Sequence, residues 1–200
     1  MQVPRPRYRP RAAQRVKSYG ITRGSTTPTS FVRSADAASG SLGRITGYAS
    51  KFDVWSTITE RDSTGGIVRY LERVQPGAYA AASTRDPSGI RVLHSHGHDS
   101  LIGSRPIATL DTLTEDSTGL RYAGRLLDTI AGREVAPMLA AGVLGSSYRF
   151  RIDDQAWDDH PGQSSHNPTG LPERTIRAAT VIEVGPTPFP AQTVTTAGIA

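Results

Sequence analysis

The chain has 200 residues, a formal net charge of +5 and no cysteine. This length fits one compact domain with an extension, and the lack of cysteine excludes disulfides and thiolate zinc sites. No segment reaches the roughly 18–20 consecutive apolar residues of a membrane-spanning helix, and the basic N-terminus lacks the apolar stretch of a secretory signal. We therefore expect a cytoplasmic protein that does not contact membranes.

The positive charge is concentrated near the N-terminus. Residues 1–33 hold eight basic residues and no acidic one, so residues 34–200 keep 15 basic and 18 acidic residues, a net charge of −3. Residues 1–43 are also rich in Pro, Ser, Thr and Gly, a composition that predicts a disordered arm. We expect this basic arm either to contact an anionic partner, such as nucleic acid or an acidic scaffold, or to be a solvated extension without a role.

From Arg44 onward, short apolar runs alternate with turn-forming residues. Several runs alternate apolar and polar residues with period two, which is typical of half-buried β-strands. The predicted strands are Ile45–Trp55, Ile67–Val74, Ile90–His96, Ile107–Leu113, Leu120–Leu127, Ser147–Ile152 and Ile176–Val184.

Two helices are predicted between these strands. The longer one begins after Asp128 as N-cap and ends near Gly145. Pro137 lies inside it, so we expect the helix either to kink there or to begin later. A short helix is expected at Ala78–Ser83. Because strands outnumber helices, the pattern predicts a mainly β fold with a few helices, an α+β domain with a barrel or rolled sheet.

We place this domain at residues 44–192, with a C-terminal tail at residues 193–200. Within the domain, residues 153–174 are polar and rich in turn-forming residues, and we predict a long loop that interrupts the last two strands. Such a loop could cover a substrate cleft or be an insertion without a role.

Three of the five histidines lie close together at the end of a predicted strand. Alternate residues of a strand share a face, so His94, His96 and His98 could present three imidazoles together, with Asp99 or His160 as a fourth metal ligand. Gly97 suggests that the strand ends here, which would scatter the rings. The alternative is that these histidines lie on the surface and have no role.

A second candidate feature is the segment Gly145–Phe150, where the predicted helix gives way to a strand. Ser147 shares a strand face with Arg149 and Arg151, opposite the apolar residues. A hydroxyl on the polar face of a strand, near a histidine, is what nucleophilic catalysis needs. A serine at a helix end can equally be a cap or turn residue.

A third candidate is Glu183, at the end of an apolar strand. Regular alternation places it on the same face as Val181 and Ala179. Its carboxylate could face solvent, or it could accept the Nδ1 proton of an imidazole and fix the orientation of the ring.

Taken in order, these features resemble the tailed-phage (caudovirus) prohead protease family, the capsid-maturation serine proteases related to herpesvirus assemblin. The resemblance runs from Ile45 to Ala191. Tyr148 and Gly185 depart from the commoner Phe and Ser of the family motifs, and the 153–174 insertion is long. The segments that carry the resemblance are Gly47–Ala49, Glu72–Tyr79, Val92–Gly103, Glu115–Leu120, Gly145–Phe150 and Glu183–Ala191.

The resemblance implies a herpesvirus-protease-like fold and a serine endopeptidase that needs no cofactor. Ser147 would be the nucleophile and His96 the general base, with Glu183 orienting His96. Because the herpesvirus relatives use a second histidine in that third position, His160 and His166 are alternatives.

The implied substrates are segments of the major capsid protein and the scaffold protein, and the chain itself. The enzyme would act in the host cytoplasm, inside the assembling procapsid, and a homo-oligomer is compatible with the sequence. Two other functions stay open on the sequence: a non-enzymatic capsid or scaffold assembly component, and a hydrolase that depends on a histidine-bound metal.

Overall fold

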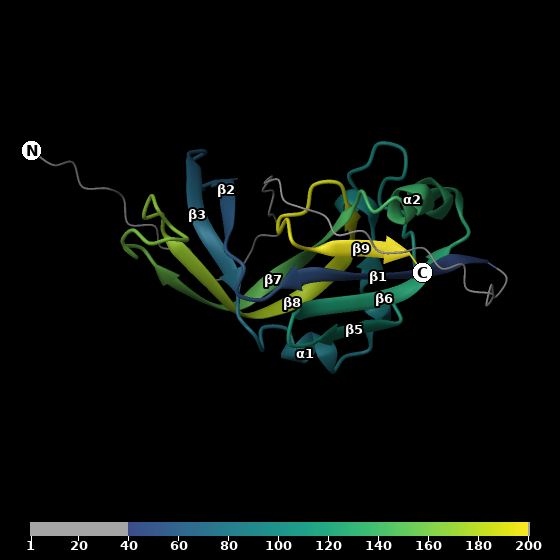
Figure 1. Ribbon diagram of the computed structural model, residues 1–200, viewed down its shortest axis with the longest axis horizontal. Coiled ribbons are helices and arrows are strands. Elements are labelled where there is room, and N and C mark those ends of the chain that lie inside the picture. The colour runs from purple at the N-terminus through teal and green to yellow at the C-terminus, as the bar shows by residue number, and fades with distance from the viewer. Residues whose placement is uncertain (1–39, 200) are drawn as a thin grey trace, which may run out of the picture.

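Two β-sheets form the framework of residues 40–199, the part of the chain that the computed structural model describes (Figure 1). Residues 1–39 of the predicted basic arm lie outside the described residues. One sheet has the order β5-β6-β1-β9 and the other β2-β3-β8-β4, with β7 paired to β8. The strands are β1 (Ser41–Lys51), β2 (Ser56–Arg61), β3 (Ile67–Val74), β4 (Arg91–Val92), β5 (Thr112–Glu115), β6 (Gly119–Leu127), β7 (Gly145–Asp158), β8 (Glu173–Thr187) and β9 (Thr196–Ile199).

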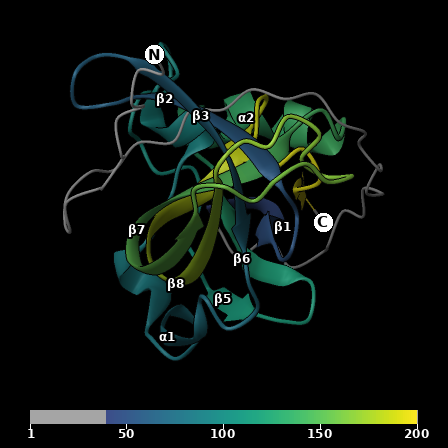
Figure 2. The same ribbon diagram turned by 90° about the vertical axis from the view of Figure 1, so that its left-hand side faces the viewer.

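Short helices complete the framework. They are α1 (Ala80–Ser83), α2 (Ile130–Ala140) and the 3₁₀ turns η1 (Pro87–Gly89) and η2 (His94–Gly97). The two α-helices lie on opposite sides of the sheets (Figures 1 and 2). None of the described helices has the length and apolar character needed to cross a membrane.

The prediction of a mainly β, α+β fold is confirmed, but the predicted barrel is wrong. The first sheet ends at β5 and β9 and the second at β2 and β4, so the described strands form two open sheets. Apolar side chains from both sheets and from α2 fill the space between them. The largest fully buried ones are Tyr79, Tyr122, Ile45, Ile58, Ile107, Leu120, Leu126, Leu139 and Ile176.

Helix α2 begins one residue later than predicted. Its N-cap is Thr129, whose Oγ1 accepts a hydrogen bond from Gly132 N (3.1 Å), while Asp128 forms an ion pair with Arg133. Pro137 lies within the helix, which ends at Ala140 rather than near Gly145.

The long loop predicted at residues 153–174 is wrong at both ends. β7 and β8 stay paired as far as Asp158 and Glu173, so only residues 159–172 connect them. Most side chains in this part of the two strands are exposed or only partly buried, so it lacks the apolar alternation by which a strand is recognised. β8 pairs in parallel with β3 from Glu173 to Ile176. The Arg174 guanidinium adds to this pairing, 4.6 Å from the ring centre of Tyr70 on β3 and 5.4 Å from that of Trp157 on β7.

Two further strands escaped the sequence analysis. β2 pairs with β3, and β9 pairs with residues 45–48 of β1, so part of the segment set apart as a C-terminal tail belongs to the first sheet. Two predicted strands were also misplaced: only Arg91–Val92 of Ile90–His96 forms a strand, and β5 starts at Thr112 rather than near Ile107.

Backbones approach very closely at Gly124 on β6. A Cβ atom at this position would lie 1.8 Å from the carbonyl oxygen of Thr109. We predict that Gly124→Ala lowers the free energy of unfolding by about 2 kcal/mol or more, because the segment around Thr109 has to move away from β6 to admit the methyl group. Urea denaturation measures this loss. Gly89→Ala is the matched control, since its Cβ would meet no atom within 4 Å; an equal loss in both variants would contradict the prediction.

Candidate active site

The histidine segment forms a tight turn directly after β4. β4 pairs in parallel with Glu183 and Val184 of β8, and the chain then enters η2. Ser95 and His96 both adopt left-handed backbone angles, with φ of 49° and 57°. This conformation costs an ordinary residue about 1–2 kcal/mol. Strain of this kind concentrates at functional sites, and here it turns His96 back toward β8.

His96 and Glu183 form a hydrogen-bonded pair between Nδ1 of the imidazole and Oε1 of the carboxylate. The Glu183 side chain is only 4% exposed and the His96 side chain 16%. A carboxylate on Nδ1 fixes the ring's orientation and places the proton of the neutral imidazole on that nitrogen. His96 Nε2 is then the nitrogen that can take up a proton.

A β-bulge at Ile182 explains how Glu183 reaches His96. Arg149 pairs with Glu183, but the next residue of β7, Phe150, pairs with Val181, so β8 has one extra residue here. The bulge reverses the alternation. Glu183 therefore shares a face with Arg149 and lies opposite Val181, and the prediction that Glu183 and Val181 share a face is wrong.

Arg149 connects the two strands to the histidine turn. Its Nη2 donates to the backbone carbonyl of His96 (2.9 Å) and contacts Nε2 of His98. Its Nε lies 3.7 Å from Glu183 Oε1, the same oxygen that bonds to His96. The carboxylate, the imidazole and the guanidinium thus form one connected group.

Ser147 lies on β7 opposite Gly185, two residues before Arg149 and on the same strand face. It is 5% exposed, and within the described residues its Oγ makes no hydrogen bond, including none to His96. Ser147 also borders a small surface hollow, which no residue of the histidine turn lines. The other residues that line the hollow are Ser56, Ile58, Glu72, Tyr148, Phe150, Ala191 and Gln192.

The neighbouring Ser146 has a different environment. It points to the opposite face of β7, where its Oγ lies 2.7 Å from Tyr122 Oη and donates to the carbonyl of Thr196 (2.7 Å). Ser146 is completely buried, and burial raises the pKa of Tyr122. Its hydroxyl therefore joins β7 to the first sheet and is committed to structure.

The three clustered histidines go to different partners. His94 is buried, and its burial lowers the pKa of the imidazole, while His96 bonds to Glu183 and His98 contacts Arg149. Within residues 40–199, no group of three or more His, Asp or Glu side chains is arranged to hold a metal ion. On a regular strand the three imidazoles would share one face, but the left-handed turn at Ser95 and His96 points them in different directions.

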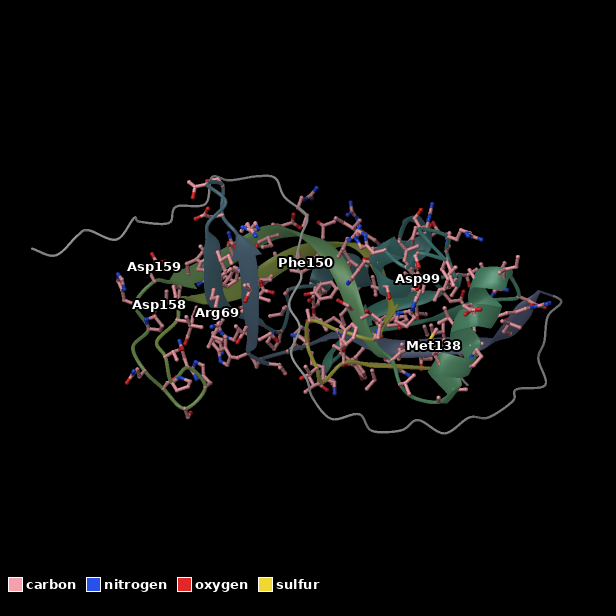
Figure 3. All side chains as sticks on the ribbon, turned by 90° about the horizontal axis from the view of Figure 1, so that it is seen from above. Arg69, Asp99, Met138, Phe150, Asp158 and Asp159 are labelled. Atoms are coloured by element: carbon pink, nitrogen blue, oxygen red, sulfur yellow. The ribbon has the colours of Figure 1, made fainter. Side chains whose placement is uncertain are left out.

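His160 and His166, the alternatives for the third position, lie at the tip of the β7–β8 ribbon. His166 Nε2 is 2.9 Å from Glu173 Oε1, and its Nδ1 is 3.1 Å from Ser164 Oγ. Glu173 lies twelve positions before Gly185, the partner of Ser147 on β8, and an extended strand of this length spans about 40 Å. His166 is therefore far from Ser147. Figure 3 shows the tip, marked by Asp158, at the opposite end of the ribbon from the histidine turn.

The sequence model of the caudovirus prohead serine proteases matches residues 29–200. The chain belongs to this family. No curated protein and no solved structure matches the chain. The match begins within the predicted basic arm and includes β9, and it confirms the resemblance drawn from the sequence. The protein is thus a phage prohead serine protease by family, acting on capsid proteins as the procapsid assembles.

The different environments of the two adjacent serines lead to a stability prediction. Ser146→Ala should lower the free energy of unfolding by about 1–3 kcal/mol, because the buried Tyr122 hydroxyl and the Thr196 carbonyl both lose a partner. Ser147→Ala should change it by less than about 0.5 kcal/mol, because Ser147 Oγ makes no hydrogen bond within residues 40–199. Urea denaturation of both variants measures the difference, and equal losses would contradict it.

Proposed function

We propose that this prohead protease is a serine endopeptidase in which Ser147 is the nucleophile, His96 the general base and Glu183 the residue that orients His96. The observation that carries the proposal is the His96–Glu183 hydrogen bond, on the strand face to which Ser147 also belongs. A nucleophile, a base and a group that orients the base are the three parts that acyl transfer through a serine requires.

In the proposed mechanism, Ser147 Oγ attacks a peptide carbonyl while His96 Nε2 takes the hydroxyl proton. Glu183 accepts the hydrogen bond from Nδ1 and stabilises the imidazolium that forms. His96 then gives the proton to the departing amine, which leaves an acyl group on Ser147. Water, activated by His96 in the same way, releases the acyl group and restores the serine. Each step uses side chains of this chain alone, and no cofactor takes part.

Ser147 and His96 are not hydrogen-bonded in the free protein. The hydrogen bonds of catalytic groups are often long before substrate binds, and they shorten in the substrate complex. We expect a bound peptide to bring Ser147 Oγ within reach of His96 Nε2.

The proposed substrates are segments of the major capsid protein and the scaffold protein, together with the chain's own arm. Residues 1–33 carry eight basic residues without an acidic one, so the arm is proposed to contact an anionic partner in the procapsid. Assembly into a homo-oligomer belongs to the same proposal. Cleavage would take place in the host cytoplasm, inside the assembling procapsid.

The first functional test replaces the nucleophile. Ser147→Ala should lower cleavage of co-expressed capsid and scaffold proteins by at least about 10³-fold and stop any trimming of the chain itself, because no other group takes over the attack. Gel electrophoresis and intact-mass measurement detect both effects.

Ser164→Ala is the matched control for Ser147→Ala. Ser164 also lies next to a histidine that is bonded to a glutamate, but at the ribbon tip, so cleavage should be unchanged. Normal processing by Ser147→Ala would overturn the proposal. So would an activity that a chelator removes and zinc restores, which would favour the metal-dependent hydrolase.

The second functional test replaces the residue that orients His96. Glu183→Gln should lower kcat by about 10²- to 10⁴-fold with little change in KM, because a neutral amide cannot stabilise the imidazolium. Steady-state kinetics on a peptide taken from a mapped cleavage site measures this. Glu173→Gln makes the same chemical change beside His166 and should leave kcat unaltered; equal effects of both substitutions would contradict the assignment of Glu183.

A further inference from the structure

We infer that Arg149 is a positioning residue for the active site: it holds the histidine turn in its left-handed conformation and ties this turn to the carboxylate of Glu183. The inference rests on the proposed roles of His96 and Glu183. It adds a fourth side chain, which contacts the base and the carboxylate rather than the substrate.

The strand register places Arg149 where it can reach both groups. Arg149 lies opposite Glu183 across β7 and β8, and its side chain leaves the face that also carries Ser147. From there, Nη2 donates a 2.9 Å hydrogen bond to the backbone carbonyl of His96. Nε remains close to the carboxylate, 3.7 Å from Oε1.

The hydrogen bond to the carbonyl acts on a strained part of the backbone. Ser95, His96 and Gly97 all have positive φ, and two of these residues are not glycine. A conformation of this kind persists only where surrounding contacts hold it. The guanidinium supplies such a contact at His96 itself, so its loss should let the turn relax and move the imidazole relative to Ser147.

The positive charge of Arg149 also lies close to the carboxylate that bonds to His96. Its Nε is 3.7 Å from Glu183 Oε1, and its Nη2 contacts Nε2 of His98. One side chain therefore joins the histidine turn to the residue that orients His96.

The shape of the guanidinium matters as well as its charge. Arg149 donates to a carbonyl from one nitrogen while another nitrogen faces a carboxylate, which the rigid fork of arginine allows. Lysine keeps the charge but cannot reproduce both contacts. The two contributions, geometry and charge, can therefore be separated by Arg149→Lys and Arg149→Met.

The chain offers a matched control on the same strand. Arg151 is the next residue on that face of β7, and its Nε pairs with Asp153 at 3.0 Å. Its side chain is 68% exposed, against 31% for Arg149. Arg151→Met therefore removes an arginine from the same strand face without touching the His96–Glu183 pair.

The experiment measures kcat and KM for the full-length variants on a peptide from a mapped cleavage site. Arg149→Met should lower kcat about 10- to 100-fold with little change in KM, because the imidazole moves relative to Ser147 while the residues that bind the peptide stay in place. Arg149→Lys should also lower kcat, because lysine cannot make both contacts. Arg151→Met should change neither kcat nor KM.

A second readout does not depend on activity. In chains that also carry Ser147→Ala, ¹H–¹⁵N NMR spectra should show displaced backbone and imidazole signals of His96 with Arg149→Met and unchanged signals with Arg151→Met. Unchanged kcat and unchanged His96 signals in Arg149→Met would overturn the inference. So would a loss confined to the free energy of unfolding. If Arg149→Met does not fold, a fully active Arg149→Lys would also overturn it.

Failure of this inference can be told apart from failure of the proposed function. If Ser147→Ala still cleaves, the proposed function fails, while the NMR signals of His96 continue to test Arg149. If Ser147→Ala is inactive and the Arg149 variants behave like Arg151→Met, only the inference about Arg149 fails.

Discussion

Backbone hydrogen bonds between β7 and β8 set the distances within the candidate site. They place Ser147, Arg149 and Glu183 on two adjacent strands, where the strand spacing of about 4.8 Å fixes how far apart the side chains begin. The same strand β8 pairs in parallel with β4, which brings the histidine turn to the end of the sheet. Side chains on paired strands are held more rigidly than side chains on loops, so this pairing suits a site that needs a fixed geometry.

Two local irregularities then aim the side chains. The bulge at Ile182 turns Glu183 away from the face of Val181, and the left-handed turn at Ser95 and His96 returns the imidazole to Glu183. Without the bulge the carboxylate would point to the other face, and without the turn His96 would continue along β4. Glycine at position 185 allows the chain before the histidine turn to pack closely against β8, because a Cβ there would lie 2.0 Å from the carbonyl oxygen of Leu93.

The sequence predicted the fold class and the residues of the pair more reliably than their geometry. Period-two alternation is strong where one face of a strand is buried, as in β1 and β6, and those strands were found. It is weak in the exposed ribbon of β7 and β8 beyond Ile152, which was taken for a loop. The open sheets could not be foreseen, because closure depends on which edges pair and not on the pattern of any one strand.

At the site, the sequence identified which residues to consider but not how they meet. His96 and Glu183 are 87 positions apart, and their hydrogen bond depends on a bulge and a strained turn that leave no periodic signal. Regular alternation even placed Glu183 on the wrong face. The contacts of Arg149 were missed for the same reason, although its position two residues after Ser147 indicated the shared strand face.

The chain contains a second serine–histidine–glutamate group, formed by Ser164, His166 and Glu173. It differs from the candidate site in which nitrogen and oxygen atoms already have hydrogen-bond partners. At the ribbon tip, Ser164 Oγ already accepts a hydrogen bond from Asn167 N, and both ring nitrogens of His166 have partners.

In the candidate site, Glu183 occupies only one nitrogen of His96, and Ser147 Oγ has no hydrogen bond within the described residues. A base needs a nitrogen that is still able to take a proton, and a nucleophile needs an oxygen that is not committed to structure. Hydrogen bonds between the right residue types are therefore insufficient by themselves. His96 Nε2 and Ser147 Oγ are available for proton transfer in the candidate site, whereas the corresponding atoms at the ribbon tip already have hydrogen-bond partners.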